Sequence, residues 1–343
     1  MTDRIARLLV ESPVVDGHND LPWALRLVDA HVSELDVVGP LPQFHTDLGR
    51  LAAGGVGAQW WSVYVPSTLP EDEALRTTIE QVHLVHRMVA RHPDRLALAL
   101  NADDVAKALA DGRIASLIGA EGGHSIGGSL GGLWALHALG VRYLTLTHND
   151  NTSWADSATD VRRAGGLTEF GRDVVRRMNE LGVIVDLSHV SAETMAAALD
   201  TTSKPVMFSH SCARALVDHP RNVPDDILRR LATNGGLCMV AFVPQFVDED
   251  YRTWDAGGSV GDKPVVTSRQ VADHVEHVRE VAGIDHVGIG GDFDGCPDLP
   301  QDLADVSTYP RLLAELADRG WSDQELMQLT GRNALRVLAE SAG

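Results

Sequence analysis

Histidine, aspartate and glutamate side chains follow several short apolar runs of this sequence. Imidazole and carboxylate groups are the ligands that Zn²⁺ and similar divalent ions prefer, and they also donate and accept protons in catalysis. Any one of them alone is more readily explained as a structural residue or a helix cap. Seven at equivalent positions are hard to explain by chance, and they are His18, Asp20, Glu121, His148, His189, His210 and Asp292.

His18 and Asp20 have the spacing of alternate residues in an extended chain. Alternate side chains of a strand point to the same face, so this pair could bind one ion. The alternative is a simple turn, because the segment from Asp16 to Asp20 is rich in turn-forming residues.

The number of candidate ligands indicates two ions rather than one. A single catalytic zinc takes three protein ligands and a water molecule. Two ions about 3.5–4 Å apart can hold a hydroxide between them and polarise a carbonyl group. Glu121 is the predicted bridge, because its strand lies between the other ligands, which are His18, Asp20, His189 and His210.

Eight apolar runs alternate with amphipathic stretches, which predicts a parallel sheet covered by helices. Most runs are continuously apolar, as expected of strands covered on both faces. Eight strands favour a closed (β/α)₈ barrel, the TIM barrel, over an open sheet, and we expect one domain spanning residues 1–343. In a barrel the residues after the strands all lie at the C-terminal rim, where active sites form. The runs are Val14–Asp16, Ala58–Tyr64, Ala115–Ala120, Tyr143–Thr147, Val183–Leu187, Pro205–Phe208, Gly236–Val240 and His286–Gly290.

The connecting segments carry no nucleotide-binding motif. The glycine-rich segment 127–132 lacks the lysine of a phosphate-binding loop, so it predicts a turn into a helix around Leu133–Leu139. The polar segment Val247–Pro264 predicts a long loop. Ser268 and Ser322 are plausible helix caps. The predicted helices are Glu71–His92, Gly166–Leu181, Ala192–Ala198, Asp225–Thr233, Ser268–Ala282 and Val306–Arg319.

The composition is that of a globular protein with an acidic surface. The chain has 343 residues, 44% hydrophobic residues and a net charge of −19, which excludes intrinsic disorder and argues against nucleic acid or an anionic membrane as partner. No apolar stretch has the length of a membrane helix or of a signal sequence. Cys212, Cys238 and Cys296 fit neither a disulfide framework nor a Cys-x-x-Cys zinc site. We therefore expect a cytoplasmic protein.

The candidate residues and Arg221 lie in the segments Val-Asp-Gly-His18-Asn-Asp20, Ile-Gly-Ala-Glu121-Gly, Leu-Thr-His148-Asn, Val-Asp-Leu-Ser-His189-Val-Ser, Phe-Ser-His210-Ser, Arg221-Asn-Val-Pro-Asp-Asp and Gly-Gly-Asp292-Phe-Asp-Gly. Through these segments the chain resembles, nearly end to end, the membrane (renal) dipeptidase family of the amidohydrolase superfamily, in its soluble bacterial branch.

The resemblance implies a role for each matched residue. His18 and Asp20 would bind the first zinc, His189 and His210 the second, and Glu121 both. His148 would stabilise the tetrahedral intermediate, and Asp292 would shuttle the proton. Arg221 would bind the C-terminal carboxylate of the substrate, which suits its planar two-pronged guanidinium.

Three neighbouring residues have alternative or structural interpretations. Without the family motif, Arg221 would be interpreted as a surface ion-pair partner of Asp225 or Asp226. Asp294 and His124 are expected to be structural, although they lie close to predicted site residues.

The resemblance implies a binuclear zinc dipeptidase that cleaves L,L- and L,D-dipeptides and forms a homodimer. One alternative is another metal-dependent amidohydrolase, acting on a lactam, a lactone or an N-acyl amino acid. An alternative of a different class is a non-catalytic scaffold that binds metal. The segment Ala241–Gln245 is less polar than in the mammalian family members, so it leaves side-chain specificity open.

Overall fold

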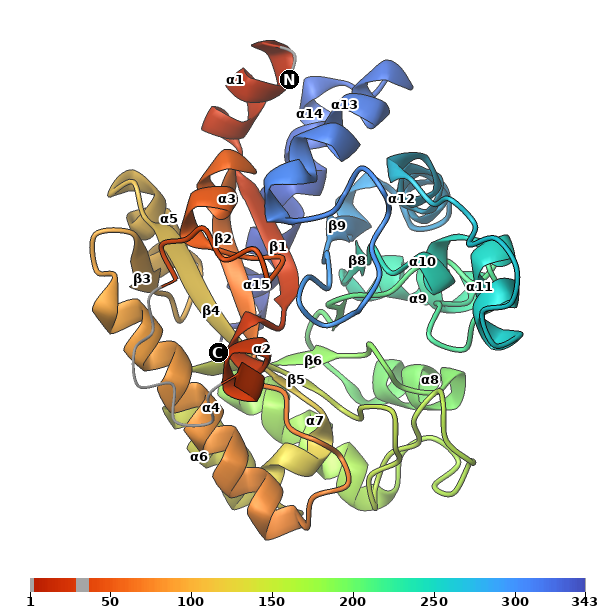
Figure 1. The fold of residues 1–343 in the computed structure, drawn as a ribbon. Coiled ribbons are helices and arrows are strands. Elements are labelled where there is room, and N and C mark those ends of the chain that lie inside the picture. The colour runs from red at the N-terminus through yellow and green to blue at the C-terminus, as the bar shows by residue number, and fades with distance from the viewer. Residues whose placement is uncertain (1–2, 29–36, 343) are drawn as a thin grey trace.

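The computed structural model describes residues 3–28 and 37–342. A parallel β-barrel lies at its centre and helices surround it (Figure 1). The ring closes because β4 pairs with β2 as well as with β5. The barrel strands are β1 (Val14–Asn19), β2 (Val56–Ser62), β4 (Ile114–Glu121), β5 (Val141–Thr145), β6 (Ile184–Asp186), β7 (Met207–Phe208), β8 (Leu237–Val240) and β9 (Val287–Ile289).

These eight strands are the eight predicted runs, so the predicted (β/α)₈ barrel is confirmed. The structure adds one short strand, β3 (Leu96–Leu98), which the sequence did not predict. It pairs only with the first half of β4, from Ile114 to Ser116, and β5 pairs with β4 from Ile118 onward. The extra strand therefore lies beside the ring and leaves the eight-stranded closure intact.

Helices follow most strands and cover the outside of the barrel (Figure 1). Among the described helices, none has the length and apolar character needed to cross a membrane. The helices are α1 (Asp3–Glu11), α2 (Leu21–Val28), α3 (Leu48–Ala53), α4 (Glu71–Arg91), α5 (Ala102–Ala110), α6 (Leu130–Ala138), α7 (Glu169–Leu181), α8 (Ala192–Thr201), α9 (Asp225–Asn234), α10 (Pro244–Val247), α11 (Glu249–Ala256), α12 (Ser268–Ala282), α13 (Tyr309–Asp318), α14 (Asp323–Met327) and α15 (Asn333–Ser341).

Two details of the predicted helices were wrong. The predicted loop Val247–Pro264 contains α11, which begins at the cap Asp248, whose side chain accepts a hydrogen bond from the Tyr251 N–H. Helix α12 is capped by Thr267 rather than Ser268. The predicted cap Ser322 is confirmed, because it forms a capping box with Glu325 at the start of α14.

The core has an inner and an outer part. The inner part fills the barrel with residues such as Val15, Trp60, Leu117 and Met239, and α15 closes it from one end with Val337. The outer part packs the helices against the outward faces of the strands. Side chains thus fill the barrel interior below its C-terminal mouth, as in the layered packing of such barrels.

One glycine of the barrel makes room for a polar aromatic side chain. A Cβ atom at Gly119 of β4 would lie 1.9 Å from the Tyr143 ring, so only glycine fits there. Tyr143 is fully buried and its hydroxyl lies 2.8 Å from Nδ1 of His18. This packing connects the barrel interior to a side chain at its mouth.

Candidate metal centre and active-site cavity

The structure brings all seven predicted His, Asp and Glu residues together at the C-terminal mouth of the barrel. Three overlapping triads have ligand atoms within 4.8 Å of one another, and in the described part of the chain these triads contain those seven residues alone. The triads are His18–Glu121–His210, Glu121–His148–His189 and His18–Asp20–Asp292.

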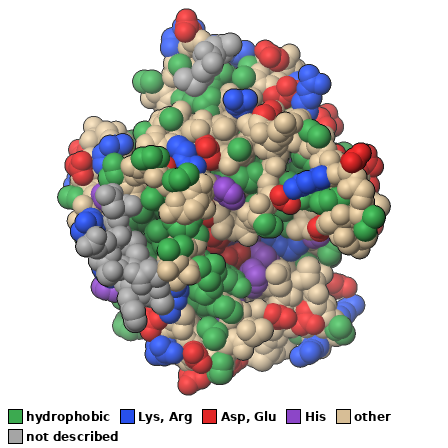
Figure 2. All heavy atoms as spheres, in the orientation of Figure 1, with side chains coloured by type: hydrophobic (Ala, Val, Ile, Leu, Met, Phe, Trp, Pro, Cys, Tyr) green, Lys and Arg blue, Asp and Glu red, His purple; other side chains and the backbone are tan. Residues whose placement is uncertain are grey.

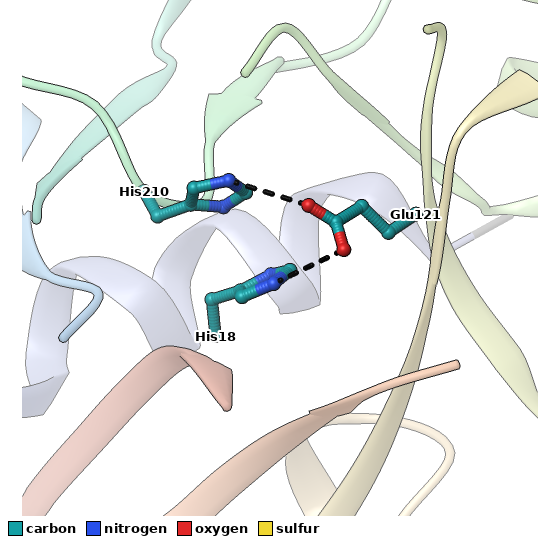
Figure 3. Close-up of side chains that lie close together, drawn as sticks. All are labelled: His18, Glu121 and His210. Carbon is teal, nitrogen blue, oxygen red and sulfur yellow. Dashed lines mark ion pairs between the residues drawn. The ribbon is translucent and has the colours of Figure 1, made fainter. Parts of the chain in front are cut away.

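Glu121 lies at the centre of the cluster, at the end of β4. It follows Ala115 and Leu117 in the inward-facing alternation of that strand, so its side chain points into the mouth. Figure 3 shows its two oxygens facing different imidazoles: Oε2 lies 3.5 Å from Nε2 of His18, and Oε1 lies 3.5 Å from Nε2 of His210. A carboxylate in this position can bridge two ions.

Two further histidines face the same carboxylate. Nε2 of His189 lies 2.9 Å from Oε1 of Glu121, and Nε2 of His148 lies 3.9 Å from it. Nε2 of His189 and Nε2 of His210 are 3.0 Å apart. Two imidazole nitrogens this close to one acceptor suit a shared cation.

The other ring nitrogen of three histidines has its own protein partner. Nδ1 of His18 meets the Tyr143 hydroxyl at 2.8 Å, Nδ1 of His189 meets Asn149 Oδ1 at 3.2 Å, and Nδ1 of His210 meets Ser209 Oγ at 2.8 Å. A proton held at Nδ1 leaves the Nε2 lone pair free for a metal, as is usual for metal-binding histidines.

The partner of His210 is itself fixed by a buried carboxylate. Ser209 Oγ donates to Asp186 Oδ2 at 2.7 Å, and the Ser209 N–H donates to Asp186 Oδ1 at 2.8 Å. Because the Ser209 hydroxyl proton is used on Asp186, its oxygen accepts the Nδ1 proton of His210. The chain of bonds thus sets the tautomer that a metal ligand requires.

Two buried atoms of the cluster have no hydrogen-bond partner among the described residues. They are Nε2 of His18 and Oδ1 of Asp20, although Oδ2 of Asp20 lies 3.1 Å from the same His18 nitrogen. Unpaired buried polar atoms are costly, so they point to a bound group. The donor set of imidazoles and carboxylates fits divalent zinc or a similar ion.

The protonation states of His189, His210 and Glu121 also suit metal binding. Burial holds the pKa of His189 and of His210 well below the usual range, reinforced by Arg221 at His189 and by His18 and Arg221 at His210, so both are neutral. Burial would raise the pKa of Glu121, but the neighbouring His18 keeps it well below its usual range. Neutral imidazole and ionised carboxylate are the forms that bind metal.

The segment with His18 and Asp20 is a strand end rather than a turn. Strand β1 continues to Asn19, with a register irregularity between Asp16 and Asn19. Such irregularities re-aim side chains near active sites. The predicted convergence of His18 and Asp20 is therefore observed, but it depends on this irregularity rather than on simple alternation.

His189 and Asp292 adopt left-handed backbone conformations, with φ of 68° and 59°. Residues other than glycine rarely adopt this conformation, and it concentrates at functional sites. Burial, together with Asp20 and Glu121, raises the pKa of Asp292 to about 8, although His18 and Arg221 lower it. Cations in the cluster would lower it further and favour the ionised form.

A cavity of about 750 Å³ opens above the cluster. Figure 2 shows a hollow near the centre of this face where acidic, histidine and basic side chains meet. Its walls combine the cluster with aromatic and polar residues. The lining includes Asp20, Trp23, Tyr64, Glu121, His148, Asn149, Asp150, His189, His219, Arg221, Gln245, Phe246, Asp292 and Asp294.

Arg221 lies in this cavity rather than on an outer surface. It is 3% exposed and its guanidinium carbon lies 5.2 Å from the centre of the Phe246 ring. No carboxylate of the described residues lies within 4.0 Å of it, and its side-chain hydrogen bonds to Ser211 Oγ and His210 O are long, at 3.5 Å. The surface ion pair with Asp225 or Asp226 is thus wrong, and the guanidinium can accept an anion from the cavity.

The two residues expected to be structural have protein partners. Nε2 of His124 lies 2.9 Å from the Val65 carbonyl. Oδ1 of Asp294 accepts the His45 N–H at 2.7 Å, and the Asp294 N–H donates to Nδ1 of His45 at 3.0 Å. Asp294 also lines the cavity.

Several residues around the cluster were not predicted from the sequence. Tyr143 and Asp186 lie within apolar strands, and their polarity there was the only available signal. Asp16 is fully buried and its Oδ1 accepts the Gly291 N–H at 2.7 Å, which fixes the loop that carries Asp292. Such supporting contacts depend on register, which the sequence alone does not give.

A parallel barrel with a carboxylate–histidine cluster at its C-terminal mouth defines the class of metal-dependent barrel hydrolases. The model of the membrane dipeptidase family (peptidase family M19) matches residues 2–342. The chain therefore belongs to the membrane dipeptidase family.

Several solved structures share this fold. The probable dipeptidase PvdM from Pseudomonas aeruginosa is 24% identical, with a TM-score of 0.87 over 98% of this chain and 97% of that one. A metallopeptidase, dipeptidase AC, is 28% identical, with a TM-score of 0.85 over 97% and 99%. A metallopeptidase from Rhodobacter sphaeroides, liganded with a phosphinate mimic of the dipeptide L-Ala-D-Ala, is 26% identical, with a TM-score of 0.85 over 96% and 99%.

Proposed function

We propose that this chain is a binuclear zinc dipeptidase that hydrolyses L,L- and L,D-dipeptides. The observation that carries the proposal is the combination of two features in one cavity. Glu121 presents its two oxygens to different imidazoles, and the buried Arg221 lies beside that cluster without a carboxylate partner among the described residues.

His18 and Asp20 would hold one ion, His189 and His210 the other, and Glu121 both. The three triads of close ligand atoms group these residues differently: His18 lies with Glu121 and His210, and His189 lies with Glu121 and His148. Asp292 forms the third triad with His18 and Asp20, and in each triad the ligand atoms lie within 4.8 Å of one another. When bound, the two ions would supply Lewis-acid activation of the substrate carbonyl and of the attacking water.

The remaining residues would bind the substrate and move protons. Arg221 would bind the terminal carboxylate through paired charge-assisted hydrogen bonds. Asp292 would accept a proton from the attacking water and pass it to the leaving amine. His148 would donate a hydrogen bond to the oxygen that becomes negative in the transition state. Burial lowers the pKa of His148, so this donor would be a neutral imidazole.

Support for L,D-substrates comes from the relative whose bound phosphinate ligand mimics the dipeptide L-Ala-D-Ala. A substrate panel tests the proposal. Zinc-loaded protein should release amino acids from free L,L- and L,D-dipeptides, and should cleave N-acetylated or C-amidated dipeptides poorly. Hydrolysis of N-acyl amino acids without hydrolysis of free dipeptides would instead support the alternative amidohydrolase. An absence of hydrolysis in well-loaded protein would support the binding scaffold.

We also propose a single catalytic domain, a homodimer and a cytoplasmic location. The family model spans nearly the whole chain, and the three thiols, two of them buried, are unpaired. Limited proteolysis should yield no stable half-chain fragment. Light scattering should give twice the chain mass of 36.9 kDa. Cell fractionation should recover the protein with cytoplasmic markers.

A further inference from the structure

The wall of the cavity beside Arg221 carries a histidine that the proposed reaction does not use. His219 lies on the loop after β7 and lines the cavity. Its ring centre lies 4.6 Å from that of Phe246, the ring over which the Arg221 guanidinium also lies. Both polar groups therefore pack against one aromatic side chain that lines the cavity.

The proton on the His219 ring can be located from its contacts. The backbone N–H of Arg221 donates to Nδ1 of His219 at 3.2 Å, so Nδ1 is an acceptor and carries no proton. Burial, together with Arg221, Arg252 and Arg214, lowers the pKa of His219 to about 4, so the ring is neutral near pH 7. A neutral imidazole that accepts at Nδ1 must carry its proton at Nε2.

We propose that the Nε2–H of His219 is a second donor for the C-terminal carboxylate of the substrate, beside the Arg221 guanidinium. Within the described residues this N–H has no acceptor. A carboxylate offers about four lone-pair sites, of which a guanidinium fork occupies two. His219 is thus a specificity-determining residue for substrates with a free carboxyl end. This inference rests on the proposed dipeptidase function.

Alternatively, His219 acts only by holding the backbone of Arg221 through Nδ1. Two variants separate the alternatives. His219→Asn places an amide oxygen near the position of Nδ1 but removes the distal donor. His219→Gln places an amide N–H near the position of Nε2. His83→Asn, on the exposed face of α4, is the matched control.

The experiment compares kcat/KM for a dipeptide and for the same dipeptide with an amidated C-terminus. His219→Asn should lower kcat/KM for the dipeptide about 10- to 150-fold, the range for a hydrogen bond to a charged group, mainly through KM. The amidated substrate offers only a neutral acceptor and should lose less, about 2- to 10-fold. His219→Gln should recover most of the lost activity, and His83→Asn should match the wild type.

Equal losses on both substrates, or no loss in His219→Asn, would overturn the inference while leaving the dipeptidase proposal intact. Calorimetric titration of metal-free protein with an L,D-dipeptide measures carboxylate binding without turnover. If metal-free wild type binds the dipeptide, zinc-loaded wild type does not cleave it, and His219→Asn weakens binding, the dipeptidase proposal fails and the carboxylate contact stands. If the wild type does not bind the dipeptide, the inference fails too.

Discussion

We propose that the side chains of the cluster divide between metal binding and proton transfer. Asp292 lies at the cluster, and its backbone is held by the left-handed loop after β9. Replacing Asp292 by Asn keeps the size of the side chain but removes the proton acceptor. We expect kcat to fall about 100- to 10,000-fold, the usual contribution of general acid–base catalysis.

The zinc content of Asp292→Asn, measured by elemental analysis, should remain that of the wild type. An unchanged kcat would exclude Asp292 as the proton shuttle. Loss of zinc together with activity would assign it to metal binding.

A residue behind the cluster should tune metal affinity without touching the ion. Tyr143→Phe removes the hydroxyl that contacts Nδ1 of His18 but keeps the ring that fills the barrel. Loss of such a supporting bond typically weakens metal binding about 10- to 100-fold. Competition with a chelating dye measures the affinity. Tyr251→Phe is the control, because it removes a hydroxyl that donates to Asp298 rather than to a residue of the cluster. Equal affinities in all three proteins would refute the supporting role.

At the residue scale, the sequence predicted the side chains that face the cavity better than those that support them. His18, Glu121 and His210 are polar where apolar strands end, so their positions alone are informative. Tyr143 lies within a strand, where an aromatic residue is ordinary. Its role depends on the space left by Gly119 on the neighbouring strand, and only the three-dimensional structure shows that contact.

Among the elements, Gly119 lets the neighbouring strands β4 and β5 pack at their observed spacing. Gly119→Ala would force the Tyr143 ring to move, because the new Cβ would lie 1.9 Å from it. Overpacking of this kind costs about 1–3 kcal/mol of unfolding free energy. Denaturant unfolding should show that loss, together with weaker zinc binding as His18 loses its partner. The control is Gly131→Ala, at an exposed position of α6, which should not lower the unfolding free energy. Equal stability of Gly119→Ala and wild type would contradict the packing argument.

Helix α12 is connected to the loop after β7 by a buried histidine. Nδ1 of His274 accepts the Ala213 N–H at 3.0 Å, and burial lowers the pKa of His274 to about 4. The unfolded chain, with an ordinary histidine pKa, binds a proton from about pH 6.5 downward, whereas the folded chain resists it until about pH 4. Stability therefore decreases as the pH falls through this window.

His274 should make the unfolding free energy about 2 kcal/mol lower at pH 5 than at pH 7. His274→Asn can still accept from Ala213 but does not titrate. In metal-free protein, the decrease measured by denaturant titration should be smaller in this variant by that amount. Parallel pH profiles for the two proteins would rule out the assigned pKa shift.

The elements themselves were largely predictable, apart from β3 and α11. The strands of the closed ring are buried on both faces, and they follow from continuous apolar runs. The exceptions have physical reasons. β3 has only three residues, and α11 is a polar helix whose single fully buried residue is Tyr251, so neither produces a strong hydrophobic pattern.

Across the whole molecule, the cluster joins strands that are far apart in the sequence. Its residues extend from His18 at β1 to Asp292 after β9, so bound ions would connect both ends of the barrel. Ions that bind only the folded state stabilise it, by about 2.7 kcal/mol at a hundred times Kd. Thermal unfolding of zinc-loaded protein should therefore occur several degrees above that of chelator-treated protein. Glu121→Gln should lose most of this difference, and a zinc-independent midpoint in the wild type would argue against the site.

The acidic residues behind the net charge of −19 lie partly in this site and partly on the surface. Three carboxylates of the cluster, Asp20, Glu121 and Asp292, would face cations, while Arg221 provides a local positive charge for an anionic group. The overall charge therefore does not decide which substrates the cavity accepts.

We propose that two ions bridged by Glu121 make this chain a dipeptidase. Metal-free protein can be titrated with Zn²⁺ while amino-acid release from a free dipeptide is followed at each addition. Release should begin only on metal addition and should reach its maximum at two equivalents per chain. Saturation at one equivalent, or no release at any loading, would refute the bridged pair.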